Sequence, residues 1–124
     1  MRLLLDTHAL LWWLADDPQL DRSAAEAIAE ADVVAVSAAS AWEIAIKQAI
    51  GKLSGPDDLP GELVSNGFTE LPVSVVHAVT AGALPPHHAD PFDRMLIAQA
   101  RIEALTLVTR DPRPVDYGIA WLRA

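Results

Sequence analysis

Apolar residues in this chain gather in short continuous runs that alternate with longer amphipathic segments. Runs of this length predict strands that are buried on both faces, as in a parallel sheet covered by helices. The predicted strands span residues 3–5, 33–36, 70–73, 105–109 and 118–122. Pro72 cannot donate a hydrogen bond to a neighbouring strand, so we place the strand that contains it near an edge of the sheet.

The amphipathic segments predict helices over residues 7–15, 21–31, 38–50, 62–66, 74–83 and 90–104. Ser37 and Asp90 stand where helix caps are favoured, and Pro91 falls in a first turn, where its missing N–H is tolerated. Strands that alternate with helices are typical of parallel sheets with right-handed crossovers. The chain therefore predicts one α/β domain over residues 1–124, with three α/β/α layers and a central parallel sheet of four to five strands.

Composition narrows the class of protein. A chain of 124 residues, 52 % of them hydrophobic, is long enough for a sizeable core and is not disordered. The absence of cysteine excludes disulfides and thiolate metal sites. The longest stretch without a charged residue, 71–89, contains three prolines, and Asp6 and His8 interrupt what would be the apolar part of a secretory signal. We therefore expect a cytoplasmic protein with no membrane partner.

The net charge of −8 argues against a simple nucleic-acid binder, which usually carries a basic patch. An acidic protein still acts on phosphodiesters when divalent cations bridge its carboxylates to the phosphate. The alternative is that the acidity only keeps the protein in solution. Charge by itself leaves both interpretations open.

Four acidic residues occupy positions that a parallel sheet would bring together. Asp6 and Asp111 directly follow predicted strands, and Glu43 lies two turns into the helix after the second strand. These three converge because the carboxyl ends of parallel strands share one edge of the sheet. Asp93, in the first turn of helix 90–104, joins them if that helix points its N-terminus at the same edge. Oxygen-only clusters of this kind suit Mg²⁺ or Mn²⁺, which activate water and stabilise phosphoryl charge.

Each acid also has an ordinary structural interpretation. Asp6, Asp90 and Asp111 stand where caps stand, and a carboxylate in a first helical turn is favoured by the helix dipole. Glu43 is spaced for an exposed i, i+4 pair with Lys47. Its helix is nearly all apolar, however, which predicts burial around most of the circumference and a carboxylate that needs a partner, a proton or a metal. Both interpretations of Glu43 stay open.

With all four acids in view, the chain resembles the PIN domain family and, within it, the VapC-type toxins of bacterial toxin–antitoxin pairs. The matching stretches are LLLDTH at 3–8, VSAASAWEI at 36–44, HADPFDRMLIAQA at 88–100 and LVTRD at 107–111. Any one acidic match would be weak, but the long third stretch together with the other three, in order, is specific.

The resemblance implies a PIN-like fold and a metal-dependent endoribonuclease that hydrolyses RNA with Mg²⁺ or Mn²⁺. Its catalytic and metal-binding acids map onto Asp6, Glu43, Asp93 and Asp111, with Asp6 and Asp93 as the firmest ligands. The resemblance places Thr7, Ser37 and Thr109 nearby, as partners of the carboxylates or of phosphate, with Asp90 as an accessory acid. It also implies a homodimer and a cognate antitoxin protein that holds the enzyme inactive.

Basic and aromatic residues add weaker expectations. Arg94 and Arg110 adjoin two of the acids and are best placed to contact an RNA backbone, although solvated surface charge is their ordinary interpretation. The histidines lack metal-ligand spacing, and we expect His88 to pack at its turn. Trp12 and Trp13 point about 100° apart on a helix and cannot both lie at the centre of one face, so one is expected in the core and the other is a candidate for an interface, with plain core packing as the ordinary interpretation of either.

Two other classes of protein share some of these features. A phosphoacceptor signalling domain would have adjacent acids after its first strand and a lysine at the end of its last strand, but Thr7 follows Asp6 and no lysine follows Lys52. A non-catalytic interaction module would use the acids only as caps, and the apolar setting of Glu43 argues against it.

Overall fold

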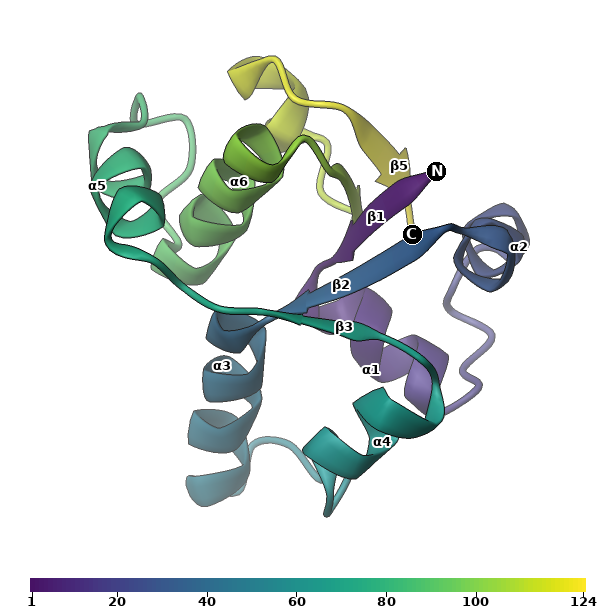
Figure 1. Ribbon diagram of the computed structural model, residues 1–124. Coiled ribbons are helices and arrows are strands. Elements are labelled where there is room, and N and C mark those ends of the chain that lie inside the picture. Colours follow the sequence, from purple (N-terminus) through teal and green to yellow (C-terminus); the bar gives the residue numbers. More distant parts are fainter.

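The computed structural model describes residues 1–124 and contains one parallel sheet with the strand order β3-β2-β1-β4-β5. The strands are β1 (Arg2–Leu5), β2 (Val33–Ser37), β3 (Thr69–Leu71), β4 (Thr106–Thr109) and β5 (Trp121–Arg123). β3 lies at an edge, as the proline beside it predicts. The predicted α/β fold with a central parallel sheet is therefore confirmed (Figure 1).

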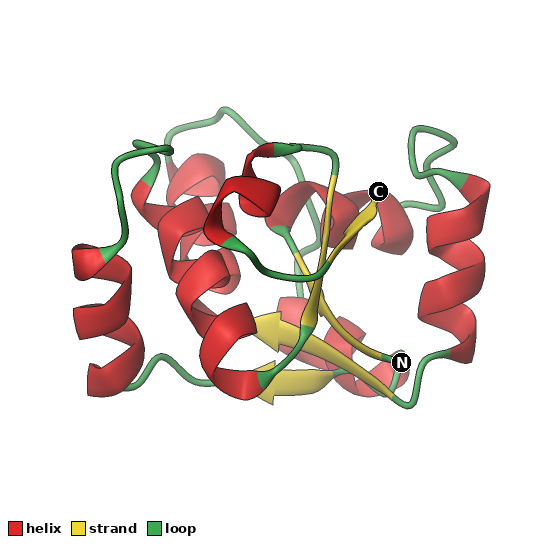
Figure 2. Ribbon diagram, turned by 90° about the horizontal axis from the view of Figure 1, so that it is seen from above, coloured by secondary structure: helices red, strands yellow, loops and turns green.

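Helices cover both faces of this sheet. They are α1 (Thr7–Leu14), α2 (Arg22–Glu30), α3 (Ala38–Ala49), α4 (Leu59–Ser65), α5 (Val75–Ala83) and α6 (Pro91–Glu103), with a 3-10 helix at Arg113–Tyr117. Leu3 and Leu5 pack into one core with α1, α2 and α4, whereas Leu4 packs into a second core with α5 and α6. This alternation is the two-residue period of a strand buried on both faces, and Figure 2 shows helices on both sides of the strands.

The register of the central strands brings their carboxyl ends to the same height, at the edge of the sheet where the site lies. Leu5 of β1 pairs with Val36 of β2 on one side and with Val108 of β4 on the other. The backbone N–H of Asp6 donates to the carbonyl of Val108 at 3.0 Å, which continues this pairing by one residue. The chain therefore leaves β1, β2 and β4 at the same level.

The surroundings of α3 differ from the prediction that most of its circumference is buried. Ile44 is buried, but Trp42 is 65 %, Ile46 37 % and Ile50 60 % exposed. α3 extends away from the end of the sheet, so the sheet covers only its beginning (Figure 1). One apolar side of α3 is thus left open.

Three boundaries also move. α4 begins at Leu59 and not at residue 62, because the Asp58 carboxylate accepts a hydrogen bond from the Gly61 N–H at 3.1 Å and caps the helix earlier. β3 ends at Leu71, just before the proline. β5 begins at Trp121 because the preceding 3-10 helix ends at Gly118, whose φ of +69° favours glycine. No helix of the chain combines the length and the apolar character needed to cross a membrane.

Candidate active site

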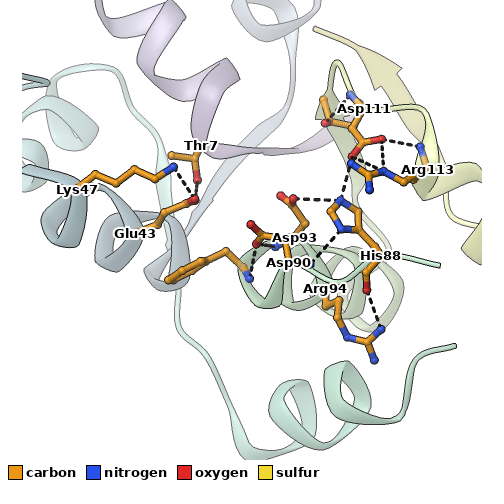
Figure 3. Close-up of polar contacts among 11 residues, drawn as sticks. Thr7, Glu43, Lys47, His88, Asp90, Asp93, Arg94, Asp111 and Arg113 are labelled. Atoms are coloured by element: carbon orange, nitrogen blue, oxygen red, sulfur yellow. Dashed lines mark hydrogen bonds and ion pairs between the residues drawn. The ribbon is translucent and has the colours of Figure 1, made fainter. Parts of the chain in front are cut away.

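All four predicted acids line one cleft of about 410 Å³ at the carboxyl edge of the sheet, here called the acidic cleft. α6 directs its first turn at this edge, so Asp93 joins the acids that follow β1 and β4. The predicted neighbours Thr7, Asp90, Thr109 and Arg110 line the same cleft. Figure 3 shows Thr7, Glu43, Asp93 and Asp111, which come from α1, α3, α6 and the turn after β4.

Asp6 has two bonds to its surroundings and no basic partner. It caps α1, accepting the Ala9 N–H at 2.8 Å. Burial raises the pKa of its carboxyl, while the bonds from Ala9 and from the Thr109 side chain act in the opposite direction. The cap interpretation is therefore correct, but it leaves one carboxylate oxygen free of that bond.

Asp93 carries the most strongly shifted carboxyl of the cleft. Its backbone is held by Asp90, the cap of α6, whose Oδ1 accepts the N–H groups of Phe92 at 2.8 Å and Asp93 at 3.1 Å. Burial, followed by the charge of Asp90, raises the pKa of Asp93 to about 6, and the charges of Asp6 and Glu43 add to the shift. No lysine or arginine lies within ion-pair distance of it.

Glu43 satisfies both interpretations that the sequence left open. Its side chain is only 12 % exposed, and it is also paired with Lys47, whose Nζ lies 3.0 Å from Oε2. The buried Thr7 hydroxyl donates to Oε1 at 2.6 Å. Glu43 is thus an oriented carboxylate whose charge is balanced.

Asp111 is the most completely bonded of the four acids. The Arg113 Nε lies 3.0 Å from both carboxylate oxygens, and the Arg113 backbone N–H donates to Oδ1 at 2.9 Å. Burial acts to raise the pKa of Asp111, but the hydrogen bonds from Arg113 and His88 outweigh it and hold the pKa below its usual value. The Thr109 hydroxyl accepts the Asp111 N–H at 3.1 Å, which fixes the turn after β4.

His88 is the residue that sequence reasoning missed. It does not simply pack at its turn: its Nε2 lies 2.9 Å from Asp111 Oδ2 and 3.1 Å from Asp93 Oδ2, and its side chain is only 5 % exposed. The sequence feature that could have pointed to His88 is its place two residues before Asp90, the cap residue at which the chain enters α6. Spacing along the sequence gave no such indication, because Asp111 comes from another segment.

Two of the predicted site residues do not reach the acidic cleft. Ser37 is completely buried, and its hydroxyl caps α3 by accepting the Ala39 N–H at 3.0 Å. The Arg94 guanidinium turns away from Asp93 and donates to the carbonyls of Ala81 at 2.8 Å and Leu84 at 2.7 Å. The Arg94 guanidinium is therefore engaged at the C-terminal end of α5 and does not line the acidic cleft.

Arg110 stays at the rim of the cleft but is partly engaged. Its guanidinium lies 4.5 Å from the centre of the Trp12 ring and donates to the Ala124 carbonyl at 2.8 Å and to that of Gln19. Trp12 thus lies at the rim, whereas Trp13 packs against Phe68 at a ring distance of 6.1 Å. Both rings are half-buried and pack against the same core, so the structure agrees with core packing for each of them.

The donor set of the cleft fits a hard divalent cation. His88, Asp93 and Asp111 each offer a ligand atom within 4.8 Å of the others, and Asp6 lines the same space. Burial raises the pKa of both Asp6 and Asp93, and neither carboxylate has a lysine or arginine within ion-pair distance. A divalent cation would compensate these charges, and oxygen ligands suit Mg²⁺ and Mn²⁺.

Comparisons with known proteins agree with this geometry. The sequence model of the PIN domain matches residues 3–119. The chain is 38 % identical to Ribonuclease VapC22 of Mycobacterium tuberculosis over 129 residues, which covers 91 % of this chain and 95 % of that protein.

Solved structures share the fold at low identity. VapBC2 from Rickettsia felis, bound to a DNA fragment from its promoter, matches with a TM-score of 0.70 and 16 % identity over 98 % of both chains. A toxin–antitoxin complex from Klebsiella pneumoniae matches with a TM-score of 0.69 and 18 % identity, over 98 % of this chain and 96 % of that one.

Proposed function

The chain belongs to the PIN domain family, and on that basis we propose that it is a metal-dependent endoribonuclease and the toxin of a toxin–antitoxin pair. The observation that carries the proposal is the convergence of Asp6, Glu43, Asp93 and Asp111 on one cleft. Similarity to a ribonuclease along nearly the whole chain supports the reaction type. Cellular RNA is then the substrate, and the cytoplasm is where the enzyme would meet it.

The four acids have different roles in the site. Asp6 and Asp93 are the primary ligands of Mg²⁺ or Mn²⁺, because their charges are uncompensated. Glu43 and Asp111 complete the site as oriented carboxylates that hold the attacking water. The bound ion supplies a nucleophile at neutral pH and stabilises the charge that develops on the phosphoryl oxygens.

The RNA backbone needs positive charge at the rim of an otherwise acidic cleft. Lys47, Arg110 and Arg113 line the cleft and provide it. Thr7 and Thr109 act on the carboxylates, since the hydroxyl of Thr7 donates to Glu43 and that of Thr109 accepts from the Asp111 backbone. We therefore assign phosphate contacts to the basic rim.

A second groove supports the antitoxin partner. It has a volume of about 510 Å³, runs between α1 and the segment before α4, and shares His8 and Trp12 with the acidic cleft. A peptide segment that follows this groove reaches the acids without leaving the surface. Solved relatives with the same fold are toxin–antitoxin complexes, which agrees with this assignment.

A homodimer is supported by an apolar face on α3, α5 and the start of α6. Trp42, Val75, Val76 and Val79 are each more than 60 % exposed there. Beside them, a groove of about 660 Å³ is lined almost only by apolar residues, including Phe92 and Met95. Apolar patches of this kind are unusual on monomers, so we assign the face to a second copy of the chain.

The decisive experiment is RNA cleavage by the purified chain, free of antitoxin. We expect Mg²⁺ or Mn²⁺ to support cleavage, EDTA to abolish it and Asp6→Asn to remove it. We also expect Asp6→Asn to relieve the growth arrest that expression of the chain causes. If the unaltered protein cuts no cellular RNA and the substitution relieves no arrest, the proposal is wrong.

A further inference from the structure

We propose that His88 is a positioning residue that donates a hydrogen bond to Asp111, keeps Asp93 in contact with the same ring nitrogen, and is not itself a metal ligand. The inference rests on the proposed metal-dependent function and assigns a role to a residue outside the four acids. Figure 3 shows the imidazole between the two carboxylates.

His88 is the only side chain that contacts both acids. Asp93 lies in the first turn of α6 and Asp111 in the turn after β4, so no local structure fixes their separation. The Nε2 atom lies 3.1 Å from one carboxylate and 2.9 Å from the other. Arg113 holds Asp111 alone. Without His88, two like charges on separate segments would face each other with nothing between them.

The hydrogen bond on the far side of the ring decides which nitrogen carries the proton. The Asp90 backbone N–H points at His88 Nδ1 at 3.3 Å, so Nδ1 is an acceptor and carries no hydrogen. The proton of the neutral ring is therefore on Nε2, where Asp111 Oδ2 accepts it at 2.9 Å and Asp93 Oδ2 lies 3.1 Å away. Each hydrogen-bonding position of the ring is satisfied in this tautomer.

Metal ligation by Nε2 would require the opposite tautomer. The proton would then lie on Nδ1 and face the Asp90 N–H, which places two donors against each other. The side chain is 5 % exposed, so neither water nor a rotation of the ring relieves that conflict. His88 therefore orients carboxylates that bind the ion, as residues behind metal ligands commonly do.

The test is Mn²⁺ binding by the full chain, measured by calorimetry. We expect His88→Ala to weaken binding about 10–100-fold, the usual loss when a residue that orients metal ligands is removed. His88→Gln should recover most of the affinity, because the glutamine amide again presents N–H donors at the end of a side chain of similar reach.

His77 provides a matched control. It is equally buried, its Nδ1 accepts the Ser74 N–H at 3.0 Å, and its Nε2 lies 3.1 Å from Glu103 Oε2. The bonding pattern is the same, but it joins α5 to α6 away from the acidic cleft. We expect His77→Ala to lower the melting temperature and to leave Mn²⁺ affinity unchanged.

Pulsed EPR on the unaltered, Mn²⁺-loaded protein separates donor from ligand and needs no variant to fold. We expect no coupling from a directly bound imidazole nitrogen. A nitrogen coupling that disappears in His88→Gln would overturn the proposal, as would Mn²⁺ affinity in His88→Ala equal to that of the unaltered chain. Failure of the unaltered chain to bind Mn²⁺ would instead overturn the metal-dependent function, and the role of His88 with it.

Discussion

The centre of the acidic cleft and its two flanks hold their carboxylates differently. At the centre, Asp6 and Asp93 have no lysine or arginine within ion-pair distance. On the flanks, Glu43 is paired with Lys47 at one end and Asp111 with Arg113 at the other (Figure 3). All four line the same cleft, so the difference comes from the neighbours of each acid and not from its distance to the sheet edge.

The comparison separates the carboxylates that would supply affinity for a metal ion from those that are already held in one orientation. Burial and neighbouring negative charge raise the pKa of Asp93 to about 6, which means that its ionised form is unfavourable until a cation arrives. Asp111 has a lowered pKa because its bonds from Arg113 and His88 outweigh the effect of burial. The central acids Asp6 and Asp93 therefore gain most from a divalent ion, and the flanking acids Glu43 and Asp111 are oriented before the ion binds.

The largest expected effect is that of Asp6→Asn. Asparagine caps a helix as well as aspartate does, so the change removes the charge and retains the cap. We expect the rate of RNA cleavage to fall about 10³-fold, because a catalytic metal contributes several kcal/mol and each 1.36 kcal/mol is tenfold. The control is Asp58→Asn at the cap of α4, outside the cleft, which should cleave at the unaltered rate.

Glu43→Gln tests one of the two flanks of the cleft. The Thr7 hydroxyl still has an acceptor in the amide, while the pair with Lys47 loses its negative member. We expect a loss of about 10–100-fold in the cleavage rate, smaller than for Asp6, since an orienting group and not a primary ligand is removed. Equal losses of cleavage rate for Glu43→Gln and Asp6→Asn would contradict the proposed difference between an orienting group and a primary ligand.

The pH dependence of stability tests whether the pKa of Asp93 is raised. Its folded pKa of about 6 lies above the unfolded value of 3.8. Its stabilising contribution is therefore complete below the unfolded pKa and is lost as the pH rises through about 6. In metal-free protein, Asp93→Asn should flatten the fall in melting temperature between about pH 4 and about pH 7.

Added Mn²⁺ should reverse that trend for the unaltered chain, because the ion binds the ionised carboxylate. Differential scanning fluorimetry at both pH values, with and without Mn²⁺, measures the two effects together. Identical pH profiles for the unaltered chain and Asp93→Asn would contradict the assignment of the raised pKa.

The smallest expected effect is that of Arg113→Ala. A lowered folded pKa makes Asp111 a source of stability above its unfolded pKa, and this stability is lost as the pH falls through the folded value. We expect a slightly lower melting temperature near neutral pH and no difference in strong acid. The effect is small because the Arg113 side chain is about half exposed. A loss of stability that persists in acid would point to packing and not to the ion pair.

Much of this arrangement follows from local sequence. The continuous apolar runs predicted the strands and their parallel arrangement. Each run ends at or near a polar residue, and the parallel register places these residues at one edge of the sheet. Asp6 and Asp111 directly follow β1 and β4, so their meeting required only the parallel register. The sequence left the direction of α6 open. In the structure this direction is fixed by the packing of Leu96 and Ile97 against the sheet.

The residues that sequence reasoning misplaced depend on contacts between distant segments. Arg94 adjoins an acid in sequence, but the open carbonyls at the end of α5 compete for its guanidinium and bind it. His88 meets Asp111 only because the turn before α6 lies beside the turn after β4. α3 is apolar on a side that this chain does not cover, and burial cannot be distinguished from an interface by composition alone.

The central place of β1 has a consequence for biosynthesis. β1 leaves the ribosome well before β4, yet β4 is one of its two neighbours in the sheet. Closing so long a loop is slow compared with local pairing, and the chain that precedes β4 contains Asp6 without Asp111. A translation product that stops before β4 therefore lacks one of the two neighbours of β1 and also the Asp111 part of the cleft, so the acidic cleft is complete only after the segment through Asp111 has been synthesised.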